Sequence, residues 1–191
     1  MEQIVSRLST RPQTTSLPPY KRPKIKPGEP FSFAYEVVAE PGNGQSKQGI
    51  IISPRDDYSS WEIRCDEGTG MGGDDEAPSP LGYLIMGVAF CLLTHIKGYL
   101  HNAPMHISSI KVEVRAEYAT LPMAEARDGQ GQGRCDAYTC HILIDSDETS
   151  EKAQQLVSVC RDACMAIATV ANAIPTTTRL FLNGSTEGIE V

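Results

Sequence analysis

The stretch from residue 80 to residue 100 limits the folds open to this chain more than any other stretch. Lys97 is its only lysine, arginine, aspartate or glutamate. Ser79 can serve as an N-cap and Pro80 suits the first helical position, so we predict a helix over about residues 80–100. Apolar side chains fall on every side of this helix, and a helix that is apolar all round is typically buried all round. We therefore expect it at the centre of the fold.

The same stretch does not predict a membrane span. Its apolar part, residues 81–93, is shorter than the roughly 18 to 20 residues that cross a bilayer. The first 30 residues are polar and proline-rich, without the apolar core of a secretory signal. A net charge of −7 argues against binding to nucleic acid, which needs a basic surface. We expect a soluble, cytoplasmic protein with neither a membrane nor a nucleic acid as partner.

The rest of the chain predicts an α+β fold with antiparallel sheets. Residues 1–30 hold six prolines and are typical of an irregular arm, and residues 31–191 are expected to form a single domain. A helically spaced apolar stripe predicts a second core helix over about residues 148–174. Segments rich in strand formers, bounded by turn signals, predict strands over residues 31–40, 47–53, 58–67, 106–120, 135–145 and 178–183. Strands in runs with helices on one face are typical of this fold class.

The cysteines are the residues most able to carry chemistry. In a reducing compartment the six should mostly be free thiols, and their spacing matches no zinc site, so we predict no metal. Cys91 lies on the first predicted helix, and Cys160 and Cys164 lie one turn apart on the second. Both helices should pack on one sheet, so Cys91 can meet one of them. A cysteine on an apolar stripe is, however, more often core packing than chemistry.

Two motifs in these helices can be compared with known families. Cys91 follows Pro80 by eleven residues, and Leu156 and Val157 precede Cys164 in the pattern L-V-x-x-x-x-x-x-C. This arrangement resembles the OsmC/Ohr family of osmotically induced and organic-hydroperoxide-resistance proteins. The resemblance covers about residues 31–184 and implies the OsmC/Ohr-like fold, with the two helices at the core of an intertwined homodimer.

The resemblance also implies a mechanism. Cys91 would attack a small organic hydroperoxide and become a sulfenic acid, and Cys164 would resolve it as a disulfide. Cys160 would be a structural neighbour. An external dithiol reductant would close the cycle, and no cofactor or metal would be needed.

Two positions depart from the family pattern. Peroxidase members place a glutamate directly after the motif proline, where this chain has Leu81, and they follow the second cysteine with a proline, where it has Met165. Glu76 is a candidate to replace the missing acid, and Arg64 is a candidate for the activating arginine. His95, one turn after the first cysteine, could act as a base or be a hydrogen-bonded core residue.

Three functions follow from these observations. The first is a thiol peroxidase that reduces organic hydroperoxides through a Cys91–Cys164 disulfide. The second, favoured by Leu81, is an OsmC-like dimeric protein without peroxidase activity that binds a small molecule or performs other thiol chemistry. The third is a structural dimer in which all six cysteines belong to the core.

Overall fold

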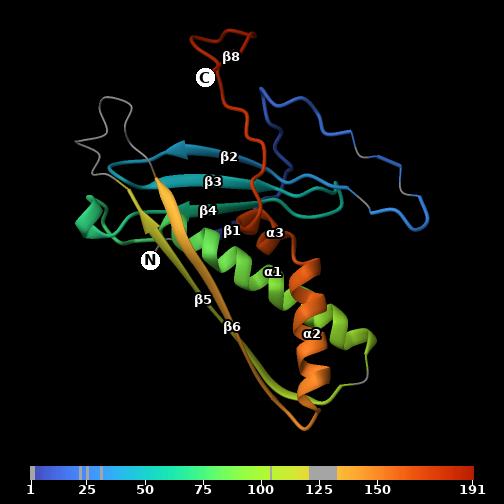
Figure 1. Cartoon of the computed structure of the whole chain (residues 1–191). Helices are drawn as coiled ribbons and strands as arrows, with labels where there is room; N and C mark the ends of the chain where they lie inside the picture. Colours follow the sequence, from blue (N-terminus) through green and yellow to red (C-terminus); the bar gives the residue numbers. More distant parts are fainter. Residues whose placement is uncertain (1–2, 22, 25, 31, 104, 121–132) are drawn as a thin grey trace. The chain divides into compact units, whose positions relative to one another are not determined.

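The computed structural model describes residues 3–21, 23–24, 26–30, 32–103, 105–120 and 133–191 (Figure 1). The chain divides into two units, one formed by Met1–Pro80 with Thr178–Val191 and the other by Leu81–Thr177. The predicted division at residue 30, between an arm and one domain, stays a prediction. Antiparallel sheets and helices confirm the predicted α+β class.

A four-stranded antiparallel sheet organises the first unit, with the strand order β1-β4-β3-β2. The strands are β1 (Val5–Arg7), β2 (Glu36–Pro41), β3 (Lys47–Ile52) and β4 (Trp61–Cys65). The hairpin of β2 and β3 and the third strand β4 were predicted, although β2 begins at Glu36 rather than at residue 31. A short C-terminal hairpin, β7 (Arg179–Leu180) and β8 (Ile189–Glu190), replaces the longer strand predicted over residues 178–183.

Strand β1 corrects the prediction of a wholly irregular arm. Its residues pair with β4, and the pairing continues on both sides, because the N–H of Leu8 donates to the Ser60 carbonyl at 3.0 Å and that of Arg64 donates to the Ile4 carbonyl at 2.9 Å. A three-residue strand is too short for a sequence pattern to reveal. It forms because the edge of β4 offers unpaired backbone groups.

The second unit consists of helices packed on a long hairpin. Its elements are α1 (Pro80–Asn102, whose first residue belongs to the first unit), β5 (Ile107–Ala119), β6 (Arg134–Ser146), α2 (Ser150–Ala163) and α3 (Met165–Ala171). Both hairpin strands were predicted to within a residue. The inward face of the hairpin presents half-buried residues, including Ile110, Val112, Ile142 and Ile144, to a core of Leu92, Ile96, Leu156, Cys160 and Cys164.

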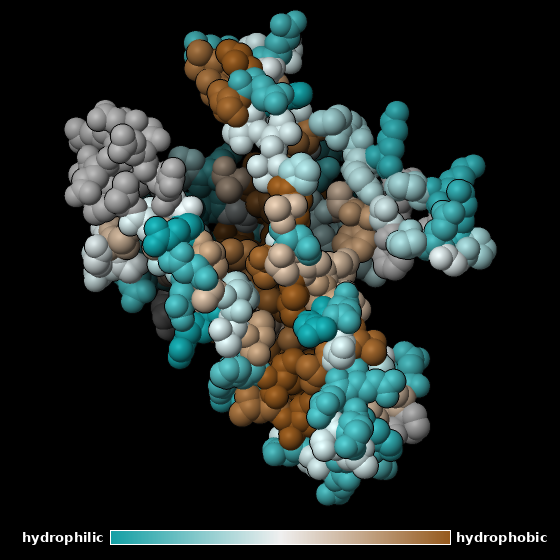
Figure 2. Space-filling view, viewed as in Figure 1, coloured by the Kyte–Doolittle hydropathy of each residue, from teal (hydrophilic) through white to brown (hydrophobic). Residues whose placement is uncertain are grey.

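Helix α1 is not buried on every side within a single chain, so its complete burial stays a prediction that depends on a second chain. Val88, Leu92 and Ile96 are buried, whereas Met86 and Phe90 form an exposed apolar face on the opposite side of the helix. Leu81 and Leu84, in the first turns, are exposed as well. Figure 2 shows apolar residues at the surface over the region of α1 and α2. By length and composition α1 also meets the criterion for a membrane span, which core helices of soluble proteins meet too.

The second predicted helix is divided in two. Cys164 adopts an extended backbone conformation (φ −78°, ψ 107°), so that α2 ends before it and α3 begins after it. No proline or glycine causes the break. Its backbone cost is small, because the N–H of Cys164 still donates to the Arg161 carbonyl at 3.1 Å and its carbonyl still accepts from Ala168 at 2.9 Å.

Candidate active site

Cys91 and Cys164 are neighbours in the second unit, close enough that the Cys91 thiol raises the pKa of the Cys164 thiol. Cys91 comes from the middle of α1, and Cys164 from the junction of α2 and α3. Cys91 is half-buried, whereas Cys164 has no exposed surface. Both thiols are free. A solute can therefore reach the first sulfur more readily than the second, which contacts it from inside the core.

The surroundings of Cys164 favour its protonated form. Burial raises the pKa of the Cys164 thiol above its ordinary value, and the neighbouring Cys91 thiol raises it further, against the opposing effect of the backbone N–H groups of Ile167 and Ala166. Cys164 therefore keeps its proton at neutral pH. A buried, protonated thiol beside a more accessible one is suited to resolve its neighbour rather than to attack a solute first.

The break between α2 and α3 falls at this second thiol. Cys164 ends α2 and is also the N-cap residue of α3, so the regular helix is interrupted at this residue. Met165 occupies the first position of α3, where the family pattern has proline and where proline is well tolerated. The helix is therefore interrupted at Cys164 without a proline at the next position.

Cys160 is part of the core. Its thiol is 1% exposed, and burial raises its pKa. It lies one turn before Cys164 on α2, a spacing that holds Cβ atoms about 5 to 6 Å apart and is too wide for a good disulfide. This supports its interpretation as a structural neighbour.

His95 lies near Cys160 rather than within the thiol pair. It is half-buried on α1 and lines a cavity of about 330 Å³, which Tyr99, Asn102, Val159 and Cys160 also line. Within the part of the chain that the structure describes, its imidazole makes no hydrogen bond to either Cys91 or Cys164. The structure therefore gives His95 no direct contact through which to act as their base.

Arg64 and Glu76, the two other candidate supporting residues, form an ion pair in the first unit. The Arg64 Nη2 lies 3.5 Å from the Glu76 Oε2, and the glutamate side chain is 67% exposed. The predicted candidates thus assemble into two pairs: an acid with an arginine in the first unit, and two thiols in the second.

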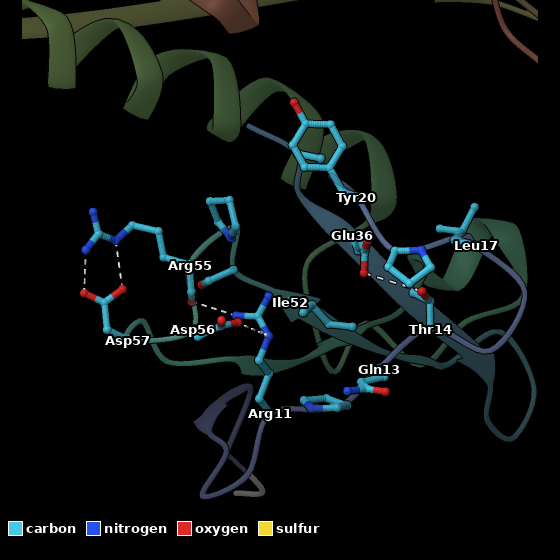
Figure 3. Close-up of a pocket in the computed structure, with 15 residues that line it drawn as sticks. Arg11, Gln13, Thr14, Leu17, Tyr20, Glu36, Ile52, Arg55, Asp56 and Asp57 are labelled. Carbon is cyan, nitrogen blue, oxygen red and sulfur yellow. Dashed lines mark hydrogen bonds and ion pairs between the residues drawn. The ribbon is translucent and has the colours of Figure 1, made fainter. Parts of the chain in front are cut away.

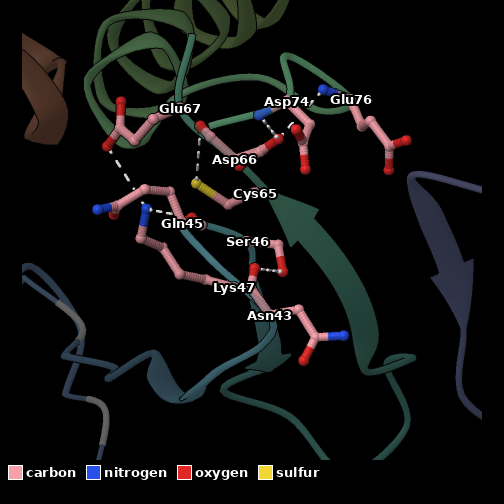
Figure 4. Close-up of polar contacts among 9 residues, drawn as sticks. All are labelled: Asn43, Gln45, Ser46, Lys47, Cys65, Asp66, Glu67, Asp74 and Glu76. Carbon is pink, nitrogen blue, oxygen red and sulfur yellow. Dashed lines mark hydrogen bonds and ion pairs between the residues drawn. The ribbon is translucent and has the colours of Figure 1, made fainter. Parts of the chain in front are cut away.

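A buried aspartate that sequence reasoning missed organises the loop carrying Glu76. Asp66 is 3% exposed, and its Oδ2 accepts the backbone N–H groups of Asp74 at 3.0 Å and Glu76 at 3.2 Å (Figure 4). Gly73 is required beside it, because an added Cβ would lie 1.9 Å from the Glu67 carbonyl oxygen. An aspartate opening a glycine-rich loop is a signal that could have indicated this role.

The Asp66 contacts predict a pH dependence. The N–H group of Glu67, followed by those of Glu76 and Asp74, lowers the pKa of this carboxyl. A lowered folded-state pKa means that the stabilisation is present above the unfolded pKa, about 3.9, and is lost as the pH falls through the folded value. We expect Asp66→Asn to lower the urea unfolding midpoint at pH 7. The variant should also lose less stability than the wild type as the pH falls from about 4 through the folded pKa of Asp66.

The matched control is Glu40→Gln, which removes an exposed carboxyl from β2 in the same unit. This control should leave the unfolding midpoint almost unchanged at both ends of the pH range. Equal effects of the two substitutions would contradict a structural role for the Asp66 carboxylate.

The remaining thiols show no comparable pairing. Cys65 and Cys140 are half-buried on strands, and Cys135 is exposed. Burial raises the pKa of both Cys65 and Cys140. Among the described residues, no three His, Cys, Asp or Glu side chains are placed to hold a metal ion.

Similarity to known proteins covers the part of the chain that holds Cys91 and Cys164. A model of OsmC-like proteins matches residues 73–179, a range that includes both paired thiols. A search of curated proteins finds no match.

Solved structures share the fold at low sequence identity. An OsmC-like hydroperoxide resistance protein from Jannaschia sp. CCS1 matches with a TM-score of 0.53 and 16% identity, over 82% of this chain and 97% of its own. An OsmC-like protein from Mycoplasma pneumoniae matches with a TM-score of 0.53 and 19% identity, over 72% of this chain and 87% of its own. An organic hydroperoxide resistance protein from Legionella pneumophila matches with a TM-score of 0.50 and 14% identity, over 71% of this chain and 88% of its own. These similarities confirm the predicted OsmC/Ohr fold.

Proposed function

Because the chain belongs to the OsmC-like protein family, we propose that it is a cysteine-based thiol peroxidase that reduces organic hydroperoxides. The observation that carries this proposal is that the half-buried Cys91 thiol and the fully buried Cys164 thiol are neighbours. Several of the structural neighbours are described as hydroperoxide resistance proteins. The proposed location is the reducing cytoplasm, where free thiols persist.

The proposed reaction has three steps. The Cys91 thiolate attacks the terminal oxygen of the hydroperoxide, the O–O bond breaks, and the alkoxide takes a proton to leave as an alcohol. This oxidises Cys91 to a sulfenic acid. The Cys164 thiol then attacks the sulfenic sulfur, forming the S–S bond and releasing water. A dithiol reductant finally exchanges with this disulfide, becoming a disulfide itself and restoring both thiols.

The contrast between the two thiols supports these assignments. Cys91 is the more accessible one, which suits the group that meets the peroxide. Cys164 is fully buried and protonated, so it stays unreactive toward solutes yet contacts the sulfur that it must resolve. The resolving step then needs no large movement to bring the sulfurs together.

The test is direct oxidation of the reduced protein with cumene hydroperoxide. Peroxide consumption is followed in the presence of dihydrolipoamide, and disulfides are mapped by mass spectrometry. We expect turnover and a Cys91–Cys164 link. An unmodified Cys91 under excess peroxide would refute the proposal.

A second candidate function is binding of a small molecule without peroxidase activity. Leu81, which stands where peroxidase members have an acid, lines an apolar cavity of about 380 Å³ together with Tyr118 and Cys135. Ligand binding without consumption of peroxide in the same assay would favour this alternative.

We also propose that the protein is a homodimer built on the exposed face of α1. Phe90 is 61% exposed there, and Met86 is 50% exposed. A Cβ added to Gly87 on this helix would meet no described atom within 4 Å, so the close backbone approach that a helical glycine allows is not used within the chain. An exposed apolar face of this kind is typical of an interaction surface.

Replacing Phe90 should test this dimer. We expect Phe90→Asp to convert the protein from dimer to monomer in sedimentation equilibrium, because a charge on the face would be desolvated in the interface. Lys97→Glu, at an exposed and already charged position on α1, is the control and should leave the dimer intact. A wild-type protein that is monomeric at micromolar concentration would refute the dimer.

A further inference from the structure

The N-terminal arm encloses a cavity in the first unit, independent of the thiol pair. The cavity has a volume of about 680 Å³, within the range of small-molecule sites. One wall is formed by arm residues between Arg11 and Tyr20, and the other by Glu36 of β2, the end of β3 and the loop that follows it. Figure 3 shows these side chains around the space.

Several contacts hold the arm against the sheet. Strand β1 pairs with β4 before the cavity begins. Beyond it, the Arg11 Nη1 donates to the Arg55 carbonyl at 2.6 Å, and the Thr14 hydroxyl donates to the Glu36 Oε2 at 3.4 Å. The arm is thus held to the sheet both before the cavity, by β1, and along it, by Arg11 and Thr14.

Its two arginines already have partners. The Arg55 guanidinium binds Asp57 through two hydrogen bonds of 2.8 and 2.7 Å and also lies over the ring of Tyr58. Arg11 contacts Asp56 at 3.5 Å in addition to the Arg55 carbonyl. Neither arginine forms an ion pair with Glu36 in the described structure.

Among the described residues, the carboxylate of Glu36 has no ion-pair partner. Glu36 is half-buried, and within the described residues the Thr14 hydroxyl is the only hydrogen-bond partner of its carboxylate. A partly desolvated carboxylate gains most from a cation that also excludes water. The neighbouring walls supply apolar surface for the rest of such a ligand, from Leu17, Ile52 and Tyr20.

From this charge balance we infer that the arm cavity binds an organic monocation with an apolar body, its ammonium group paired with Glu36. This class includes aralkylamines. The inference does not depend on the peroxidase proposal, because it concerns different residues and binding rather than turnover.

The test compares two probes of nearly equal shape, tryptamine and its neutral analogue tryptophol. Each is titrated into the full-length protein, and backbone amide shifts are followed by two-dimensional NMR. We expect tryptamine to shift the amides of Thr14 and Ser53, and to bind about 10- to 100-fold more tightly than tryptophol, as a charge-assisted hydrogen bond implies.

Two variants decide whether Glu36 is responsible. Glu36→Gln keeps the acceptor for Thr14 and removes the charge, so it should abolish the preference for tryptamine. Glu40→Gln lies on the same strand, four residues on, and should leave the preference intact. The same spectra report whether each variant is folded.

Three results would overturn the inference. They are equal affinity for the two probes in the wild type, an unchanged preference in Glu36→Gln, and the absence of shifts at Thr14 and Ser53 up to millimolar tryptamine. Shifts confined to other residues would likewise place the amine site elsewhere.

Discussion

Replacing Cys91 with serine should abolish hydroperoxide reduction, by about 10⁴-fold or more, the scale of loss expected when an enzyme loses its nucleophile. Serine keeps the size of the side chain, but a hydroxyl at neutral pH is a far weaker nucleophile than a thiolate. The measurement is peroxide consumption with dihydrolipoamide as reductant. Cys140→Ser, which alters a half-buried thiol on β6 outside the pair, is the matched control and should keep most of the activity.

Cys164→Ser should separate the two halves of the cycle. We expect Cys91 to react once with peroxide and then to persist as a sulfenic acid, which dimedone traps and mass spectrometry detects. Sustained turnover without Cys164 would mean that another group resolves the sulfenic acid. Loss of the first oxidation as well would mean that Cys164 is needed to activate Cys91.

The second large effect concerns the core that holds the thiols together. Leu156→Ala should lower the free energy of unfolding by about 2 to 5 kcal/mol, because it leaves a cavity in a fully buried cluster. Urea unfolding at one fixed protein concentration measures the loss. Leu143→Ala, at a position 46% exposed on β6, should change the free energy by about 0.5 kcal/mol or less.

This core substitution has a consequence for the site as well. Leu156 belongs to the same buried cluster as Cys160 and Cys164, so its truncation should also slow formation of the Cys91–Cys164 disulfide. An unchanged rate, together with the expected loss of stability, would show that the thiol contact does not depend on this packing.

Local patterns in the sequence were sufficient to predict the hairpin and the first helix of the unit that holds the thiols. The alternation around Val112 and Ile142 predicted the long hairpin, and the uncharged run after Pro80 predicted α1. These signals work because each residue's environment repeats with the period of its own strand or helix. The resemblance carried by Cys91 and Cys164 pointed to the family that the comparisons confirm.

Other features depended on partners far away in the chain. Strand β1 exists because β4 has a free edge, and Asp66 is buried because two N–H groups of its loop turn toward it. No periodic signal marks either one. One face of α1 is exposed within the single chain, because periodicity reports that a residue is apolar and not which chain covers it.

The sequence by itself determined two cysteines at family spacing, on two helices that both carry apolar faces. Only the tertiary structure decided that Cys91 meets Cys164 rather than Cys160, and that the helix breaks at Cys164 without a proline. The physical reason is that a sulfur–sulfur contact depends on how two helices pack on a shared hairpin. That packing is set by many contacts distant in sequence, and no single motif encodes it.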